Sequence, residues 1–375
     1  MNLRGGEVLP DWKIRELMQK GVIIGADESL VNPSSLDLRV SAEWYKVLGS
    51  FLPPEDQKVE EALKSWKVVD DDKVLKSEFF VDTAQPYIVK LMEGLKLPGT
   101  LTAKIHNKSG RGRIGISVKG LADKVSRFDN IPSGYKGGIY AEICATKFPL
   151  LVKERDAIPQ IVFYNGNPNP LQGLDLDLLL NEHPILTDSR GNPSYTEEER
   201  KEIVRTGQFT FNVDLSRRLL IYRAKGNKTL VLSEKDRYEP HDFFEPVRKT
   251  QKDNNIVVIY PGDFVLIKSK EHIRLPPEFA AEISGYSIDL GDLRTHYAGW
   301  INASHGYDPK NPNVPSYILF EVRARDTPVV LRDGQNFAKF VVHRMLDTPK
   351  KLYMAERSTN FDDLRSFMPG IFKKK

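Results

Sequence analysis

A basic, glycine-containing stretch at residues 107–115 offers side chains that could bind a polyphosphate. It reads NKSGRGRIG and carries Lys108, Ser109, Arg111 and Arg113. Glycine lets the backbone turn tightly and approach a ligand closely, while Lys, Arg and Ser donate hydrogen bonds to anionic oxygens. A solvated basic turn or a short nucleic-acid contact has the same composition, so the stretch alone leaves three interpretations open.

A second residue that could do chemistry is Glu142, in the segment YAEIC at residues 140–144. Its apolar neighbours Ile139 and Ile143 indicate a strand in which this carboxyl group is buried. A buried carboxyl group can accept a proton and return it during a reaction. The exposed polar face of a strand is the alternative place for such a residue.

The segments around these residues are expected to be strands. Residues 100–105 and 114–118 alternate in polarity on either side of the basic stretch. Residues 87–163 continue as short strands separated by Gly and Pro turns, which is typical of a β sandwich or barrel. The basic stretch should therefore join two strands of one β domain.

The cysteine and histidine content argues against zinc chemistry. Cys144 is the only cysteine, and none of the seven histidines is followed two residues later by Glu. Zinc nucleobase deaminases need a His or Cys close to a Glu, and then two further cysteines. We expect no zinc site and interpret Cys144 as a packed core thiol, which fits a reducing compartment.

Length and charge suggest a two-domain globular protein. The chain has 375 residues and a net charge of +4, which is too mild to imply nucleic-acid binding. No apolar run approaches the length of a membrane span, and the first residues lack the apolar region of a signal peptide. These features predict a cytoplasmic protein.

The chain also repeats itself. Residues 97–105 resemble residues 275–283, and the segment around Glu142 resembles the segment around Glu321. Each of these glutamates is followed seven residues later by a proline, Pro149 or Pro328. The repeat predicts two β domains of related fold.

The expected organisation follows from the repeat and from the turn signals. We predict a first domain at residues 1–170, a partly helical linker at 171–207, a second domain at 208–350 and a C-terminal tail at 351–375. Helices are expected at residues 10–21, with Asp11 as N-cap, at 59–66, at 175–180 and at 196–206.

In the order of its motifs, the sequence resembles the dCTP deaminase family of the dUTPase-like fold, in its long, two-domain bacterial form. The resemblance runs through residues 8–11, 33–39, 108–113, 122–123, 128–137 and 142, and then through 222–225, 242–246, 296–299 and 321–323. It implies a mainly β chain of two tandem distorted jelly-roll domains. It also implies a homotrimer with active sites between subunits.

The resemblance further implies that dCTP binds with Mg²⁺ and that water replaces its 4-amino group without zinc. Glu142, Ser109 and Arg113 would be catalytic. The implied substrate-binding residues are Lys108, Arg111, Ala122, Asp123, Arg127, Asp129, Tyr135 and Gln160. Gly110 departs from the family pattern, where many members have a second Ser, and the segment between Ala122 and Gly134 is longer than usual.

Several functions remain open at this stage. The leading one is a dCTP deaminase that releases dUTP, for which dTTP would be an expected inhibitor. A bifunctional enzyme would also split dUTP into dUMP and diphosphate, and a plain dUTPase would use Asp129 to activate water. A nucleotide-binding regulator without catalysis is the alternative outside enzymes.

The two repeats differ in the residues that could bind phosphate. The second repeat has no Lys or Arg at residues 284–292, where the first repeat has its basic stretch, and it has two aspartates instead. We therefore expect chemistry in the first domain and a degenerate second domain. Residues 357–375 are a candidate lid over the nucleotide.

Overall fold

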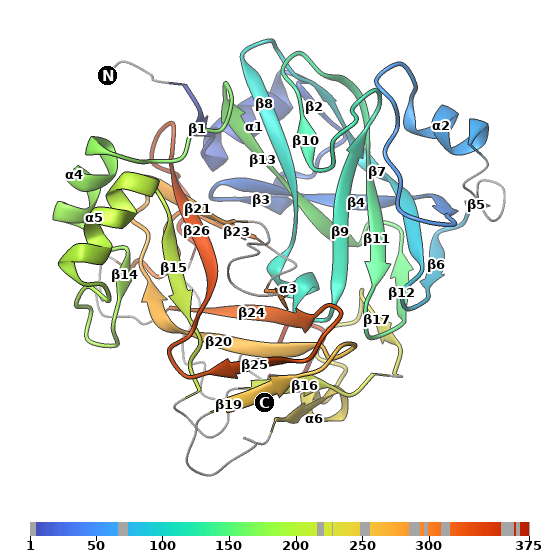
Figure 1. The fold of residues 1–375 in the computed structure, drawn as a ribbon. Helices are drawn as coiled ribbons and strands as arrows, with labels where there is room; N and C mark the ends of the chain where they lie inside the picture. Colours follow the sequence, from blue (N-terminus) through green and yellow to red (C-terminus); the bar gives the residue numbers. More distant parts are fainter. Residues whose placement is uncertain are drawn as a thin grey trace. The chain divides into compact units, whose positions relative to one another are not determined.

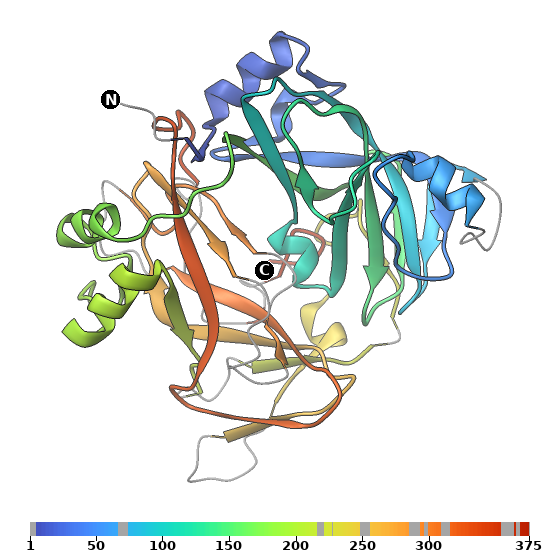
Figure 2. The same cartoon turned by 45° about the horizontal axis from the view of Figure 1, so that its top comes forward.

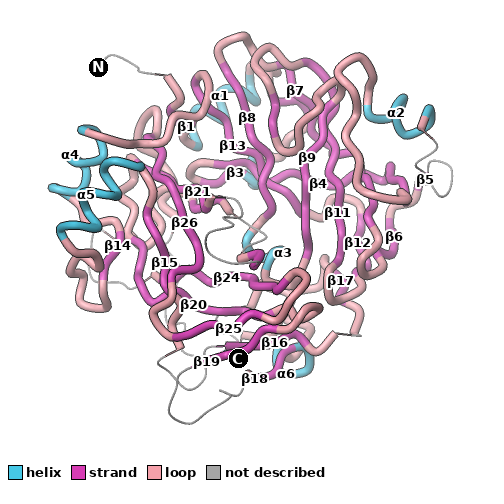
Figure 3. The backbone as a smooth tube through the Cα atoms, viewed as in Figure 1, coloured by secondary structure: helices cyan, strands magenta, loops and turns pink. Residues whose placement is uncertain are grey.

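The computed structural model describes residues 5–66, 74–215, 221–226, 228–247, 256–284, 293–295, 299–308, 316–353, 364 and 368–374. The chain divides into two compact units, residues 1–168 with 226–235, and residues 169–225 with 236–375. Strands dominate the regular structure, as the magenta segments of Figure 3 show. The predicted loop at Asp70–Asp72 lies outside the described residues.

The main sheet of the first unit has the strand order β10-β8-β13-β4-β7-β11-β9. Among the short strands, β1 pairs with β13 and β2 pairs with β7, while β3 and β5 both pair with β4. These strands are β1 (Glu7–Val8), β2 (Ile23–Ile24), β3 (Val31–Asn32), β4 (Ser35–Lys46), β5 (Val74–Leu75), β7 (Pro86–Lys96), β8 (Leu101–Asn107), β9 (Ile116–Ala122), β10 (Asn130–Ile131), β11 (Lys136–Ala145) and β13 (Ala157–Asn165).

A smaller sheet of the first unit contains a strand from far along the chain. β12 (Leu150–Lys153) pairs antiparallel with β6 (Glu78–Val81) and parallel with β17 (Leu230–Val231). We expected residues 229–232 in the second domain, but residues 226–235 belong to the first unit. A two-residue strand carries too little pattern for its partner to be predicted.

The described residues of the second unit form three sheets of antiparallel strands. Their orders are β18-β16-β20-β24-β22 with β14 on β20, then β15-β26-β21-β23, and the pair β19-β25. The strands are β14 (Leu186–Thr187), β15 (Phe209–Asn212), β16 (Ile221–Ala224), β18 (Phe244–Pro246), β19 (Ile256–Ile259), β20 (Val265–Ile273), β21 (Phe279–Ile283), β22 (Leu293–Arg294), β23 (Trp300–Ile301), β24 (Tyr317–Ala324), β25 (Val329–Arg332) and β26 (Asn336–Arg344).

Strand register supports the predicted repeat. The match of residues 97–105 with 275–283 extends without a gap to Ile88 and Leu266. Ile88 of β7 pairs with Glu142 of β11, and Leu266 of β20 pairs with Glu321 of β24. The two glutamates therefore occupy equivalent places in their sheets, and the prediction of a mainly β chain with two tandem domains is confirmed.

The helices lie close to their predicted positions, with one correction at the first helix. α1 (Asp11–Gln19) has Pro10 rather than Asp11 as its N-cap, and Asp11 is the first helical residue. The Asp11 carboxylate instead accepts a hydrogen bond from Arg15, one turn later, at 2.7 Å. The other helices of the first unit are η1 (Glu28–Leu30), α2 (Val59–Ser65) and α3 (Ser109–Gly112).

The segment predicted as a linker is packed into the second unit. It forms α4 (Leu174–Glu182) and α5 (Glu197–Thr206), which lie side by side in Figures 1 and 2. Leu176, Leu180 and Ile203 belong to the unit's hydrophobic core. Their burial explains why this segment is ordered rather than a free connection.

The end of the chain is also held in the second unit. Phe372 packs edge-on against Phe243 of α6 (Pro240–Phe243), with ring centroids 5.4 Å apart. Lys373 N donates to Tyr238 O at 2.9 Å. Residues 368–374 would have to leave this contact to act as a lid, and residues 354–363 lie outside the described part of the chain. Among the described helices, none is long and apolar enough to cross a membrane.

Candidate active site

The basic stretch joins β8 to β9, as predicted, but it folds as one helical turn. The N–H groups of Arg111 and Gly112 both donate to Lys108 O at 2.9 Å, which closes α3. Lys108 Nζ donates to Asp37 Oδ2 at 2.5 Å, and Asp37 also accepts from Asn32 at 2.9 Å. The Lys108 ammonium is therefore paired with a carboxylate in this structure.

Arg111 points back into the first unit. Its Nε donates to the Ala157 carbonyl of β13 at 3.1 Å. Burial lowers the pKa of Arg111, although the negative charges of Asp156 and Asp37 act to raise it. Arg113 and Ser109 are half-buried at the two ends of the turn.

Gln160, on β13, holds the start of this turn in place. Its Oε1 accepts from the Ser35 hydroxyl at 2.9 Å, and its Nε2 donates to Asn107 O at 3.0 Å. Gln160 is buried, so these bonds satisfy groups that water does not reach. The structure places Gln160 behind the turn, where it positions the residues that precede Lys108.

Glu142 is buried, as the sequence predicted, with its side chain 5% exposed. It lies on β11 directly opposite Lys119 of β9. Lys119 Nζ donates to Glu142 Oε1 at 2.9 Å. The buried Oε2 accepts no hydrogen bond from the described residues, which leaves one carboxylate oxygen open to a ligand or a water molecule.

The β9–β11 ladder sets the distances around Glu142. Ile116 pairs with Ala145, so the end of the basic turn lies about three residues along the strand, roughly 10 Å from Glu142. Ala122 pairs with Ile139 in the other direction. Because side chains alternate between faces, the Ala122 methyl group lies on the opposite face from Glu142. Only the Ala122 backbone is available on the Glu142 side.

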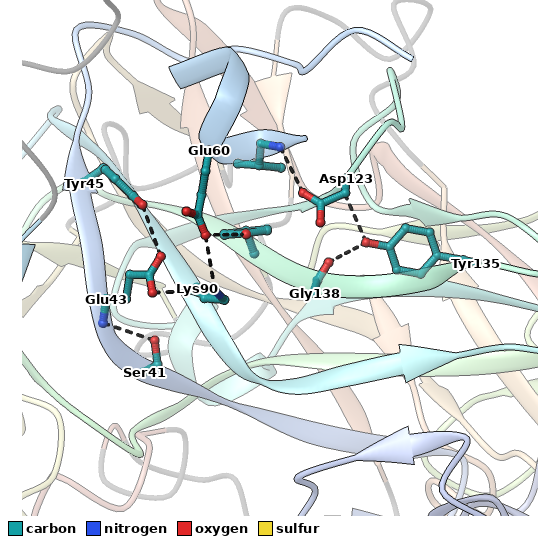
Figure 4. A network of polar contacts seen from close by, with 10 residues as sticks. Ser41, Glu43, Tyr45, Glu60, Lys90, Asp123, Tyr135 and Gly138 are labelled. Carbon is teal, nitrogen blue, oxygen red and sulfur yellow. Dashed lines mark hydrogen bonds and ion pairs between the residues drawn. The ribbon is translucent and has the colours of Figure 1, made fainter. Parts of the chain in front are cut away.

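Asp123 and Tyr135 form a fixed corner beyond Ala122 (Figure 4). The Tyr135 hydroxyl donates to Gly138 O at 2.5 Å and accepts from Asp123 N at 3.1 Å. Asp123 Oδ1 accepts from Val59 N, at the start of α2, at 2.9 Å. Burial raises the pKa of Asp123, against this hydrogen bond. A Cβ on Gly137 would lie 2.8 Å from the Tyr135 hydroxyl, which explains the glycine.

Asp129 closes the loop between Gly120 and Asp129. Its φ is +66°, and its Oδ1 accepts from Gly120 N at 2.6 Å. Its own N–H donates to Gly120 O at 2.9 Å. Gly120 has no room for a side chain because its Cβ would lie 2.6 Å from Ile105 Cβ. Arg127, between these residues, is exposed.

Two segments of the first unit, residues 50–59 and 123–128, contact each other, and we call them together the clasp. The second of them contains part of the longer-than-usual segment between Ala122 and Gly134. Lys124 N donates to Gln57 O at 3.0 Å, and the Ser126 hydroxyl donates to Glu55 at 2.9 Å. Lys119 Nζ donates to the Ser50 hydroxyl at 2.7 Å and lies 4.7 Å from the centre of the Phe128 ring. The clasp is thus tied to the Glu142 ion pair.

α2 continues from the clasp and covers the same face of the sheet. Val59 and Leu63 pack in one apolar cluster with Ile88, Leu121 and Tyr140. Ile88 is the cross-strand partner of Glu142, and Tyr140 is two residues away on the same face. This cover explains why β11 is buried on both faces at Glu142.

A polar network fixes α2 to the sheet (Figure 4). Lys90 Nζ lies 3.2 Å from Glu60 Oε1 and 3.6 Å from Glu43 Oε2. The Tyr140 hydroxyl donates to Glu60 at 3.1 Å. Burial opposes the charge on Glu60, but the contacts with Lys90 outweigh it and lower its pKa. The network keeps the cover helix in register with β7 and β11.

Sequence reasoning missed Lys119 and Ser50. A lysine between apolar residues of the ISVKGLA strand was the available signal, but its partner depends on strand register. Within the described residues, no group of three or more His, Cys, Asp or Glu side chains could hold a metal ion. The absence of a resident zinc stays a prediction.

Comparison with known proteins is consistent with this geometry. Residues 5–167 match the family model of the 2'-deoxycytidine 5'-triphosphate deaminase N-terminal domain, and residues 185–365 match that of its C-terminal domain. The crystal structure of 2'-deoxycytidine 5'-triphosphate deaminase from Agrobacterium tumefaciens is 28% identical, with a TM-score of 0.79. The similarity covers 92% of this chain and 99% of that one.

Shorter relatives match less than half of the chain. The "dCTP deaminase, dUMP-forming" of Persephonella marina is 30% identical over 161 residues, which is 42% of this chain and 82% of the relative. The protein of the same name from Methanosphaera stadtmanae is 26% identical over 163 residues, again 42% of this chain, and 78% of the relative.

The matched domain models and the similar structure show a two-unit, mainly β enzyme of the hydrolytic deaminase class. With both of its domain models matched in order, the chain belongs to the dCTP deaminase family.

Proposed function

We propose that the first unit deaminates dCTP with water to give dUTP and ammonia, and that Glu142 transfers the protons. The observation that supports this is a buried carboxylate with Oε1 on Lys119 and Oε2 open. Glu142 takes a proton from the water that adds to C4 of cytosine. It then gives a proton to the departing amino group, so that one water is consumed for each ammonia released.

Lys108, Ser109 and Arg113 serve the charged parts of the substrate in this proposal. Their cationic and hydroxyl donors suit phosphate oxygens and developing negative charge. Mg²⁺ enters with the triphosphate, whose oxygens and retained waters it prefers, so it is part of the substrate. Lys108 has to exchange Asp37 for phosphate when the nucleotide binds.

The product we propose is dUTP rather than dUMP. Splitting dUTP needs a further carboxylate that activates water at the phosphate, and Asp129 was the sequence candidate. Asp129 Oδ1 accepts a hydrogen bond from Gly120 N and holds its own loop, which argues against that role. Relatives named dUMP-forming make the bifunctional reaction the second candidate.

We also propose a homotrimer, in which equivalent domains pair around a three-fold axis, and inhibition by dTTP as a nucleotide of similar shape. The family resemblance implies domains that close in threes, and closed point-group symmetry then favours three chains. Light scattering that finds a stable monomer would contradict the trimer. Unchanged initial rates with added dTTP would contradict the inhibition.

The direct test is to incubate the full-length protein with dCTP and Mg²⁺ and to separate the products by chromatography. We expect ammonia and dUTP in equal amounts without diphosphate. Diphosphate that appears in step with ammonia would replace this proposal by the bifunctional one. Recovery of unchanged dCTP would reject deamination.

A further inference from the structure

The ammonium group of Lys119 has three partners, although the side chain is 33% exposed. Its ammonium contacts Glu142 Oε1 at 2.9 Å, the Ser50 hydroxyl at 2.7 Å and the face of the Phe128 ring at 4.7 Å. These partners come from three separate parts of the chain: β11, the first clasp segment and the second clasp segment. A flexible side chain gains such an arrangement only where several contacts offset its lost rotamer freedom.

The contact with Lys119 makes the two oxygens of Glu142 different. Oε1 is fixed by the ammonium, whereas Oε2 is buried and accepts no hydrogen bond from the described residues. Fixing one oxygen also fixes the plane of the carboxylate, and therefore the direction of the other. A proton-transfer group works only when this direction matches the reacting atoms.

The other charges near Glu142 are engaged elsewhere. On β7, Lys90 lies between Glu43 of β4 and Glu60 of α2, and Tyr140 of β11 donates to Glu60. Asp123 accepts from the backbone of Val59. This second network pairs its charges with one another, and within the described part of the chain Lys119 is the cation that donates to the Glu142 carboxylate.

We propose that Lys119 is a positioning residue for deamination, and that it orients the Glu142 carboxylate only when the clasp is closed over it. The proposal rests on the function proposed for Glu142. Ser50 and Phe128 belong to the two clasp segments, so opening either segment removes a contact that holds the Lys119 ammonium. Clasp closure and carboxylate orientation are thereby coupled through one side chain.

The test compares steady-state kinetics of Lys119→Met with those of Lys119→Arg in the full-length protein. Methionine keeps the aliphatic stem of the side chain and removes its charge. We expect Lys119→Met to lower kcat about 10-fold or more while KM for dCTP stays within about 3-fold, because orientation is lost but nucleotide contacts remain. Lys119→Arg should recover most of kcat, since a guanidinium can reach the same partners.

Two further variants serve as controls. Lys64→Met removes an exposed lysine of α2 and should leave both constants unchanged. Ser50→Ala should lower kcat less than Lys119→Met does, because it removes one of the contacts that hold the ammonium. A Lys119→Met enzyme with wild-type kcat would overturn the proposal. So would a rise in KM alone, which would make Lys119 a substrate contact.

A second measurement separates this proposal from the proposed function. The thermal unfolding midpoints of wild type, Lys119→Met, Glu142→Gln and the double variant form a cycle that needs no activity. Non-additive shifts support the coupling between the two side chains, and additive shifts overturn it. A wild-type protein that does not deaminate dCTP would instead reject the function while the cycle still reports on the contact.

Discussion

Glu142 and Glu93 are both buried glutamates on neighbouring strands of the first unit, yet their surroundings differ. Glu93 on β7 has both oxygens satisfied by Arg39, from Nε at 2.8 Å and from the backbone N–H at 2.9 Å. Glu142 has one oxygen on Lys119 and one open oxygen. Burial alone therefore does not distinguish the two carboxylates, whereas the Glu142 oxygen that accepts no hydrogen bond from the described residues does.

The second unit also has a buried glutamate with both oxygens hydrogen-bonded, but its partner is an asparagine rather than an arginine. Glu271 of β20, at the place of Glu93, accepts from Asn212 N at 2.8 Å and Asn212 Nδ2 at 2.7 Å. Glu321, at the place of Glu142, is 2% exposed. The lysine equivalent to Lys90 is Lys268, which is buried over the Tyr317 ring. The second unit therefore retains buried carboxylates at both equivalent places.

The largest effect is expected for Glu142→Gln. The amide keeps the size of the side chain but cannot take up and return a proton, so kcat should fall about 1,000-fold or more. Binding of dCTP, measured by titration calorimetry, should remain close to that of wild type. A variant with a kcat near that of wild type would show that Glu142 does not transfer the protons.

Glu93→Gln should have the opposite profile. It breaks a buried ion pair, which should cost about 3 kcal/mol of unfolding free energy. Since Glu93 has no open oxygen, kcat per folded molecule should stay within about 3-fold of wild type. Denaturant unfolding and active-site titration measure the two quantities. A large loss of kcat with unchanged stability would contradict the contrast between the two glutamates.

Glu271→Gln should be milder and should depend on pH. Burial raises the pKa of Glu271 above its ordinary value of 4.5, so its ionised form is disfavoured in the folded chain. Its folded form therefore binds more protons than the unfolded form above pH 4.5, and wild-type stability rises as pH falls through this window. Relative to Glu271→Gln, the wild-type unfolding midpoint should rise as the pH is lowered from 7 towards 4.5. A constant difference between the two proteins would refute this linkage.

The smallest effect is expected for Glu321→Gln. If the second unit is scaffold, kcat should stay within about 2-fold of wild type, with the nucleotide affinity unchanged. The same assay as for Glu142→Gln gives the comparison. A loss as large as that of Glu142→Gln would indicate a site shared between the repeats.

The sequence predicted the β class, the repeat, the burial of Glu142 and the helices α4 and α5, because periodicity and turn residues encode these features locally. It did not predict that Lys119 faces Glu142, since opposite residues on two strands depend on register. Asp11 was wrong as an N-cap because Pro10 ends the extended segment before α1. The inward position of Arg111 depends on the Ala157 carbonyl, which is distant in sequence.

The positions of several proposed site residues could not be predicted from the sequence alone. Asp123, Asp129 and Tyr135 follow one another in a motif, but each is fixed by a backbone partner that a sequence does not reveal. Their assignment as substrate contacts stays a prediction. The loop at residues 285–292, on which the degeneracy of the second repeat was argued, lies outside the described residues.

The strand β17 has a consequence for synthesis on the ribosome. The smaller sheet of the first unit lacks a strand until residues 230–231 have been made, by which time residues 169–225 of the second unit have also been made. A nascent chain of 168 residues therefore exposes the edge of β12, and an exposed strand edge invites pairing with other chains. Because each unit consists of two separate stretches of the chain, a single cut releases neither unit on its own. Limited proteolysis at one site within residues 169–225, or truncation of the gene there, should therefore damage both units.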